Sequence, residues 1–213
     1  NVIEHPLIRG QVAAVAQTYA LSYEPAGREL LVAESKLIGE EVSRFLKFHE
    51  SVDDLLVKVK MLRFLSQRTG TCYMRCTGMD ALNSAGVVTY EVDSKYGTNY
   101  HDRLLEYLKH VQRNDLVISS GLTDVKGDRS LRPSAQADPD MYLHVVDKTK
   151  DGIIVRGAKI HQSGSLCAHE GLIMPTREMR EGDKDYAVCF ATPVDAEGII
   201  HVYGRGTLEA RAL

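Results

Sequence analysis

The chain has 213 residues, of which 44% are hydrophobic and 26% charged, and its net charge is −3. This composition is typical of a globular protein with a proper core, and it excludes a disordered chain. No apolar run approaches the roughly 20 residues of a membrane-spanning helix, and the slightly acidic balance argues against nucleic acid as the main partner.

The first ten residues, NVIEHPLIRG, lack the charged and then apolar pattern of a secretion signal. The chain also contains only four cysteines. We therefore expect a cytoplasmic protein, a compartment in which paired cysteines more often bind metals or act in redox chemistry than form structural disulfides.

Residues 1–114 have the pattern of helices. Segments 8–24 and 33–49 combine good helix formers with apolar residues spaced by threes and fours. Ser51, with Asp54 behind it, is the expected N-cap of a third helix, which carries one apolar stripe. The stripe consists of Val52, Leu55, Leu56, Val59 and Leu62.

Gly70 allows a break after this third helix, and we expect a further helix to run through Cys72 and Cys76 towards Tyr90. Asn99 with Asp102 is the predicted start of the last helix of this half. The residues of that helix that we expect to face inward are Leu104, Leu105, Leu108 and Val111.

From Asp115 onward the pattern changes to short segments rich in β-branched and aromatic residues, separated by Gly, Asp and Pro. The predicted strands are DLVISSG (115–121), MYLHVVDK (141–148), GIIVRGAKI (152–160), EGLIMPT (170–176), YAVCFATPV (186–194) and IIHVYGR (199–205). A turn at 150–152 suits a hairpin, and the charged stretch 176–185 is most simply a solvated loop.

The predicted fold class is therefore α+β, with an all-helical N-terminal domain over residues 1–114 and an antiparallel β domain over residues 115–213. The last clear strand ends near Gly204, and TLEARAL supplies neither another strand nor a cover for the sheet. We expect the β domain to be incomplete and the chain to be a fragment.

Cys72 and Cys76 are the first candidate site. On one helix, residues four apart lie on the same face, with Cβ atoms about 5–6 Å apart. Three interpretations stay open: two small packed residues, a helical disulfide, or two thiolate ligands of a metal centre such as an iron–sulfur cluster. The spacing alone favours packing, because C-x₃-C is not the C-x₂-C of zinc ribbons or thioredoxins.

Two further stretches are candidates for ligand binding. Residues 119–140 form a long connection rich in Gly, Asp, Ser and Pro between the two halves, and such connections are often functional. A polar linker is the alternative. His161 leads from a predicted strand into a Gly/Ser-rich turn, where backbone N–H groups can approach a ligand closely.

These same residues resemble a known family. The segments ESKLIGEEVSRFLKFHESVDDLLVKVKMLRFLSQRTGTCYMRCTGMDALN, KYGTNYH, LTDVKGDRSLRPSAQADPD and GIIVRGAKIHQSGSLCAHEGLIMPT are similar to the 4-hydroxybutyryl-CoA dehydratase family, which also carries vinylacetyl-CoA Δ-isomerase activity. The likeness runs over residues 5–205 in several long segments, so it is specific.

The resemblance implies a fold like that of the acyl-CoA dehydrogenases: an N-terminal helical domain, a middle β domain and a C-terminal helical bundle, the last of which is absent here. It implies a lyase that dehydrates 4-hydroxybutyryl-CoA to crotonyl-CoA by a radical mechanism, with isomerase side activity. The cofactors would be FAD and a 4Fe-4S cluster, the substrate an acyl-CoA, and the assembly a homotetramer.

By the same resemblance, Cys72 and Cys76 match two ligands of the cluster. The other two ligands and the base that accepts the proton lie outside the chain, so we expect this chain alone to be inactive. Met74 stands where the family has Gln, and Ser163 where it usually has Thr. The positions that match flavin-contacting segments are Leu122, Thr123, Asp124, Lys126, Gly127, Asp128, Arg129, His161, Gln162 and Ser163.

Two other functions remain as alternatives. Flavin-dependent 4-hydroxyphenylacetate-type hydroxylases share the superfamily and part of the flavin region, but lack the cysteine pair and tend to carry His where this chain has Ser120-Gly121. A non-catalytic binding module is the second alternative. The visible spectrum separates the three, because cluster and flavin, flavin alone, or neither would be seen.

Overall fold

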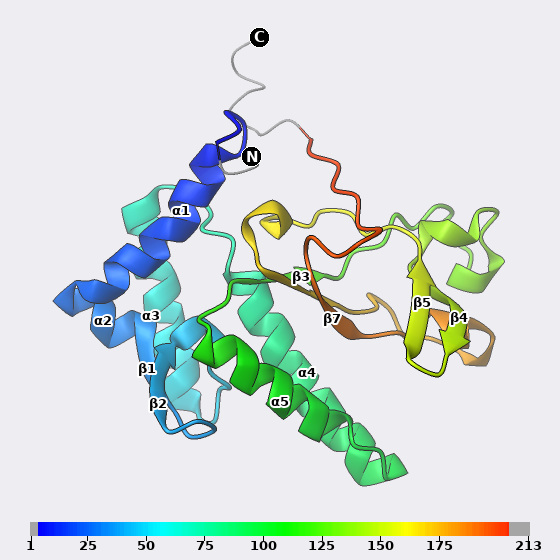
Figure 1. The fold of residues 1–213 in the computed structure, drawn as a ribbon, viewed down its shortest axis with the longest axis horizontal. Coiled ribbons are helices and arrows are strands. Elements are labelled where there is room, and N and C mark those ends of the chain that lie inside the picture. Colours follow the sequence, from blue (N-terminus) through cyan, green and yellow to red (C-terminus); the bar gives the residue numbers. More distant parts are fainter. Residues whose placement is uncertain (1–3, 205–213) are drawn as a thin grey trace.

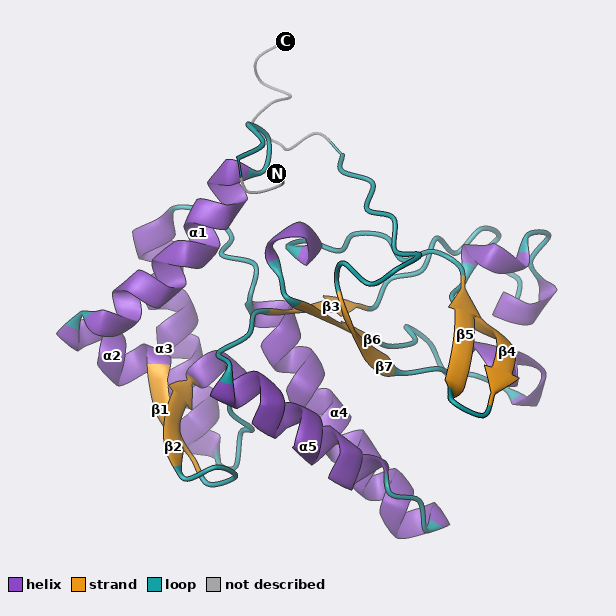
Figure 2. Cartoon of the chain, in the orientation of Figure 1, coloured by secondary structure: helices purple, strands orange, loops and turns teal. Residues whose placement is uncertain are grey.

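The structure is a computed structural model that describes residues 4–204, and it combines helices with three small sheets (Figures 1 and 2). The α-helices are α1 (Arg9–Ala20), α2 (Pro25–Leu31), α3 (Val52–Thr69), α4 (Cys76–Tyr96) and α5 (Tyr100–Arg113). The strands are β1 (Val32–Ser35), β2 (Glu40–Ser43), β3 (Ile118–Gly121), β4 (His144–Thr149), β5 (Gly152–Arg156), β6 (Glu170–Ile173) and β7 (Phe190–Pro193).

The helices α1, α2 and α3 and the β1–β2 hairpin form one side of the molecule, and the β4–β5 hairpin lies at the opposite side (Figure 1). Between them, α4 packs along α5 and beneath the sheet of β3, β6 and β7. The part of the chain that the structure describes holds no helix with the length and apolar character needed to cross a membrane.

The ends of α3 confirm the expected local signals. The Ser51 side chain accepts a hydrogen bond from the backbone N–H of Asp54, and Gly70 ends the helix with a left-handed φ of 62°. The last helix, α5, begins directly after Asn99, but the Asn99 side chain makes no cap bond. Asp93 replaces it, because its carboxylate accepts hydrogen bonds from the N–H groups of Tyr100 and His101.

Asp54 gives the start of α3 a dependence on pH. Burial raises the pKa of this carboxyl group, but hydrogen bonds from Lys47 and from the N–H of Glu50 outweigh burial and lower the pKa to about 2. The folded pKa lies below the unfolded value of about 3.9. The stabilisation is therefore complete above about pH 4 and is lost as the pH falls towards 2.

The wild type should have a larger free energy of unfolding than Asp54→Asn, as measured with urea. We expect this difference to shrink steadily as the pH falls from about 4 to 2. The matched control is Asp102→Asn, which changes an exposed carboxylate in the first turn of α5. A difference for Asp54→Asn that stays constant over this range would contradict the assignment.

The predicted helix over 33–49 is wrong. The chain forms the antiparallel hairpin β1–β2 there, followed by a short 3-10 helix over Arg44–Leu46. Gly39 has a φ of 70° in the turn, which interrupts any helix. The Arg44 side chain then donates to the carbonyl oxygens of Leu30 and Val32, which holds the 3-10 helix against the hairpin.

The apolar stripe of α3 does not face the core. Val52, Leu55, Leu56 and Val59 are exposed, whereas Met61 and Leu65 are fully buried. The helix is thus amphipathic in sequence but is turned so that its first two turns present apolar side chains outward. Tertiary packing at its C-terminal half decides the rotation, because Met61 and Leu65 belong to a buried cluster with Phe45 and Tyr73.

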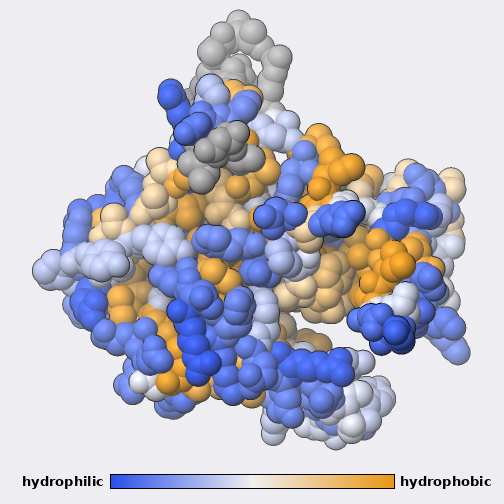
Figure 3. Space-filling view, in the orientation of Figure 1, coloured by the Kyte–Doolittle hydropathy of each residue, from blue (hydrophilic) through white to orange (hydrophobic). Residues whose placement is uncertain are grey.

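The β half is mixed rather than antiparallel. β6 lies in the centre of its sheet, parallel to β3 and antiparallel to β7, while β4 and β5 form the predicted hairpin with a turn at 150–151. The hairpin carries exposed apolar side chains, and an orange patch covers it in Figure 3. No strand forms over residues 199–204, contrary to expectation.

The charged stretch 176–185 is more than a solvated loop. It leads into a short 3-10 helix, Glu181–Tyr186, around the buried carboxylate of Asp183. Asp183 accepts hydrogen bonds from Arg132 and Ser134, which tie this stretch to the long connection between the halves. Burial raises the pKa of Asp183, but these hydrogen bonds outweigh it and hold the pKa below the usual range.

Over residues 4–204, two buried clusters form the core, and α4 contributes to both. The first packs α2 and α3 against the beginning of α4, and the second packs α4 and α5 against β3 and β6. The second cluster joins Leu82 and Leu108 to Ile118 and Leu172, so it includes residues from both sides of position 114. The predicted domain boundary at 114 stays a prediction.

Candidate functional site

The two cysteines do not share a helix as predicted. Cys76 is the first residue of α4, whereas Cys72 lies in the loop that follows α3. Met74, between them, has a left-handed φ of 60°, which prevents the helix from starting earlier. The i, i+4 geometry that motivated the pairing is therefore absent.

Burial alternates along this segment. Tyr73 and Arg75 are buried, at 5% and 3% exposure, while Cys72 is exposed and Met74 and Cys76 are half-buried. The cysteines thus lie on the more exposed side of the segment. Burial raises the pKa of the Cys76 thiol, and the nearby Cys72 raises it further.

Within residues 4–204, no group of three or more His, Cys, Asp or Glu side chains converges in a way that could hold a metal ion. The predicted ligands Cys72 and Cys76 are two thiols, whose soft sulfur suits iron and zinc. This count equals half of the four protein ligands that an iron–sulfur cluster normally takes.

The structure brings the two predicted flavin segments together. The N–H of Ile160 donates to the carbonyl oxygen of Thr123 over 2.7 Å, and the Gln162 side chain donates to the same oxygen over 3.4 Å. Asp124 and Lys159 form an antiparallel bridge beside them. Residues 122–124 and 159–162 thus run side by side, although they are almost 40 positions apart in sequence.

Asp124 has a structural role that its sequence position did not reveal. Asp124 is 1% exposed, its carboxylate lies 2.6 Å from Lys159 Nζ, and the carboxylate also accepts a hydrogen bond from Thr176. Lys159 Nζ donates in addition to the carbonyl oxygens of Leu122 and Met174. Burial lowers the pKa of Lys159, and its ion pair with Asp124 opposes that effect.

The Gln136 side chain fixes the turn at 126–129 by two hydrogen bonds. The Gln136 side chain accepts from the N–H of Asp128 and donates to its carbonyl oxygen. Lys126 and Gly127 have left-handed φ values of 77° and 48°. The Arg129 side chain is exposed and makes no ion pair with another described residue, so its charge is available to a ligand.

His161 also has a left-handed φ, of 56°. Among the described residues, no acceptor takes a hydrogen bond from the backbone N–H of His161, Gln162 or Ser163. Three successive free N–H groups beside a left-handed residue resemble the concave arrangements that bind anionic or carbonyl oxygens. This loop can therefore donate to a polar ligand.

Gly164 joins this loop to the cysteine segment. A Cβ atom at position 164 would lie 2.6 Å from Met74 Cβ and 3.0 Å from the Met74 carbonyl oxygen, so only glycine allows the two segments to approach so closely. The candidate cofactor loop and the cysteine segment are thus in direct contact. Tyr73, Arg75, Lys159 and Gly164 are the supporting residues that sequence reasoning missed.

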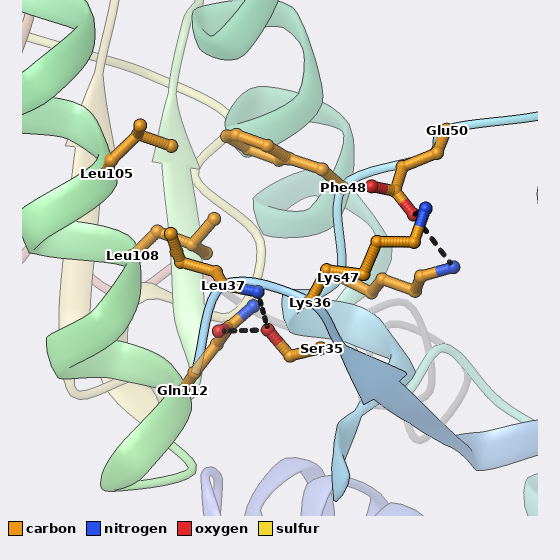
Figure 4. Close-up of a pocket in the computed structure, with 9 residues that line it drawn as sticks. All are labelled: Ser35, Lys36, Leu37, Lys47, Phe48, Glu50, Leu105, Leu108 and Gln112. Carbon is orange, nitrogen blue, oxygen red and sulfur yellow. Dashed lines mark hydrogen bonds and ion pairs between the residues drawn. The ribbon is translucent and has the colours of Figure 1, made fainter. Parts of the chain in front are cut away.

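A separate pocket of about 250 Å³ lies between the β1–β2 hairpin and α5 (Figure 4). Glu50 pairs with Lys36 and Lys47 at its mouth, and Ser35 donates to Gln112 at its base. None of the residues predicted for cofactor binding lines it. It is therefore distinct from the junction around Cys72, Thr123 and His161.

Comparisons with known proteins match almost the whole chain. The family model described as 4-hydroxyphenylacetate 3-hydroxylase N terminal matches residues 1–212. The chain is 52% identical over 213 residues to 4-hydroxybutyryl-CoA dehydratase/vinylacetyl-CoA-Delta-isomerase from Clostridium aminobutyricum, and it covers 44% of that protein.

Two solved structures show the same fold over this region. An oxygen-tolerant archaeal 4-hydroxybutyryl-CoA dehydratase from N. maritimus matches with a TM-score of 0.95 and 46% identity, over 99% of this chain and 42% of that one. The oxygenase component of 4-hydroxyphenylacetate 3-monooxygenase in complex with FAD matches with a TM-score of 0.74 and 29% identity, over 93% of this chain and 40% of that one. The chain thus spans less than half the length of these relatives.

Proposed function

Since the chain belongs to the family described as 4-hydroxyphenylacetate 3-hydroxylase N terminal, we propose that it functions as part of a 4-hydroxybutyryl-CoA dehydratase with vinylacetyl-CoA isomerase activity. The observation that carries the proposal is the contact between the cysteine segment and the loop 161–164, which joins the two candidate cofactor regions. The 52% identity to the clostridial dehydratase supports this choice of activity.

FAD is the proposed flavin, because the related monooxygenase is known in complex with FAD. The residues fit such a group at the junction. The free N–H groups of His161, Gln162 and Ser163 would donate to ring carbonyl oxygens, and Arg129 would balance phosphate or flavin charge. Exposed Leu122 and Val125 offer apolar surface beside them.

Cys72 and Cys76 would supply two of the four protein ligands of a 4Fe-4S cluster, because both are free thiols on the more exposed side of one segment. The other two ligands and the proton acceptor are proposed to belong to polypeptide outside these 213 residues. The same proposal includes a fold like that of the acyl-CoA dehydrogenases, a domain boundary at residue 114 and a homotetrameric assembly.

Removing the unactivated proton β to the carbonyl of a 4-hydroxyacyl thioester is the difficult step of this reaction. When bound, flavin supplies one-electron chemistry and cluster iron a Lewis acid for the departing hydroxyl. Cys72 and Cys76 would hold the cluster, and the loop 161–163 would orient the flavin. The contact between Met74 and Gly164 joins the two segments that carry these residues.

A flavin-dependent aromatic hydroxylase is the second candidate, favoured by the fold shared with the monooxygenase. The chain is 46% and 52% identical to two dehydratases but 29% identical to the monooxygenase, and this difference favours the dehydratase. A preparation with flavin and without iron would support the hydroxylase instead.

The test is Cys76→Ala in the complete protein, purified without oxygen. We expect loss of iron and a fall of more than about 100-fold in crotonyl-CoA formation, because a lost ligand should cost more than a lost supporting residue. FAD absorbance and far-UV circular dichroism should stay unchanged. Cys189→Ala, at an exposed position on the β side, is the matched control. Full iron content in Cys76→Ala would overturn the proposed cluster site.

A further inference from the structure

Arg75 stands between Met74 and Cys76, and its charged side chain is buried where a surface loop would normally place it in water. Its guanidinium donates to the Thr18 hydroxyl over 3.0 Å and to the Ser43 hydroxyl over 3.3 Å. It also lies 3.5 Å from a carboxylate oxygen of Asp115. These partners come from α1, from β2 and from the loop after α5, so Arg75 fixes one segment to three others.

Two aromatic rings complete the surroundings of Arg75. The guanidinium carbon lies 4.5 Å from the ring centroid of Tyr19 and 4.5 Å from that of Phe45. Stacking of this kind suits the flat guanidinium, and a lysine ammonium could not reproduce it together with the hydrogen bonds. The flat shape of the guanidinium, as well as its charge, therefore determines how the Arg75 side chain is oriented.

Stability alone is a poor explanation for a buried cation at this point. Taking a charged side chain out of water costs free energy, and the Asp115 side chain that faces Arg75 is itself 48% exposed. A second anchor, Tyr73, is already buried in the cluster with Phe45, Met61 and Met79. Along the segment 72–76, the buried residues Tyr73 and Arg75 alternate with the more exposed Cys72, Met74 and Cys76. The two buried side chains therefore hold the thiols on the opposite, more exposed side of the segment.

We propose that Arg75 is a positioning residue for the thiol pair: its guanidinium holds the segment 72–76 in the shape that keeps Cys72 and Cys76 ready to bind metal together. This inference rests on the proposed function, because it gives the cysteine pair a metal to bind. Arg75 touches neither metal nor substrate and acts through the backbone of the segment.

The experiment uses the complete protein, purified without oxygen, stripped of iron with a chelator and titrated with Co²⁺. Thiolate binding is read from the sulfur-to-cobalt charge-transfer band rather than from activity. We expect Arg75→Gln to weaken Co²⁺ binding about 10- to 100-fold, the usual effect of losing a residue that orients a ligand. FAD binding should not change.

Arg132→Gln is the matched control, because Arg132 likewise pairs with a carboxylate, that of Asp183, but far from the thiols in sequence. It should leave Co²⁺ affinity unchanged. Thr18→Val keeps the guanidinium and removes one of its acceptors. This variant therefore tests the positioning role of Arg75 if Arg75→Gln does not fold. We expect a smaller, several-fold loss for Thr18→Val.

The outcomes separate the two proposals. If the wild type shows no charge-transfer band, the cysteine site itself fails and the role of Arg75 fails with it. If the band is present, disappears in Cys76→Ala, and keeps its wild-type affinity in Arg75→Gln and Thr18→Val, the positioning role is wrong while the proposed function stands.

Discussion

Lys159→Met should destabilise the protein by about 3–5 kcal/mol, the cost typical of removing one partner of a buried ion pair. Asp124 is 1% exposed, and Lys159 Nζ, 2.6 Å from its carboxylate, supplies the compensating positive charge. The same ammonium donates to the carbonyl oxygens of Leu122 and Met174, so three acceptors lose their donor together. Of the partners of Asp124, the Thr176 hydroxyl would remain.

Urea unfolding followed by circular dichroism measures this effect, and a double variant tests its origin. Asp124→Leu combined with Lys159→Met removes both charges, and we expect it to recover a large part of the stability that Lys159→Met loses. A cost below about 1 kcal/mol for Lys159→Met would show that the pair is not buried as described.

Gly78→Ala should have the second-largest effect on stability, although it adds only one methyl group. Gly78 lies in the first turn of α4, where a Cβ atom would be 2.0 Å from the carbonyl oxygen of Ile118 and 2.7 Å from its carbonyl carbon. Backbone cannot move aside as a flexible side chain can. The helix must therefore separate from β3, and overpacking of this kind costs about 1–3 kcal/mol or more.

Gly10→Ala is the control for Gly78→Ala, because Gly10 lies in α1 and a Cβ atom there would meet no atom of residues 4–204 within 4 Å. The same change should be neutral or stabilising by up to about 1 kcal/mol at Gly10, since alanine favours the helix. We expect the two variants to move the urea midpoint in opposite directions. Equal shifts would show that helix propensity, rather than the contact with Ile118, governs both sites.

Several elements could be predicted because the signal and the structure lie within a few residues of each other. Ser51 and Gly70 mark the ends of α3, since a cap depends on one hydroxyl or one left-handed residue beside the helix. The two-residue turn at 150–151 similarly defines the β4–β5 hairpin. The cysteine pair and the loop at His161 could also be singled out from residue types alone.

Long-range contacts decided the rest. The apolar stripe at Val52 and Leu55 fits an inward-facing helix, yet packing of Met61 and Leu65 turns it outward, and periodicity cannot indicate which part of a stripe finds a partner. Segment 33–49 has helical spacing but pairs as a hairpin, because Gly39 and the hydrogen bonds of Arg44 favour another geometry.

The sequence by itself determined the residue types of the candidate site: two thiols four apart, and a left-handed-prone loop of His, Gln, Ser and Gly. Only the tertiary structure decided how they meet. The Met74–Gly164 contact and the burial of Arg75 join segments about 90 and 57 positions apart. Such contacts depend on the shape of the packed core, and no local pattern in the chain encodes a distance between segments so far apart.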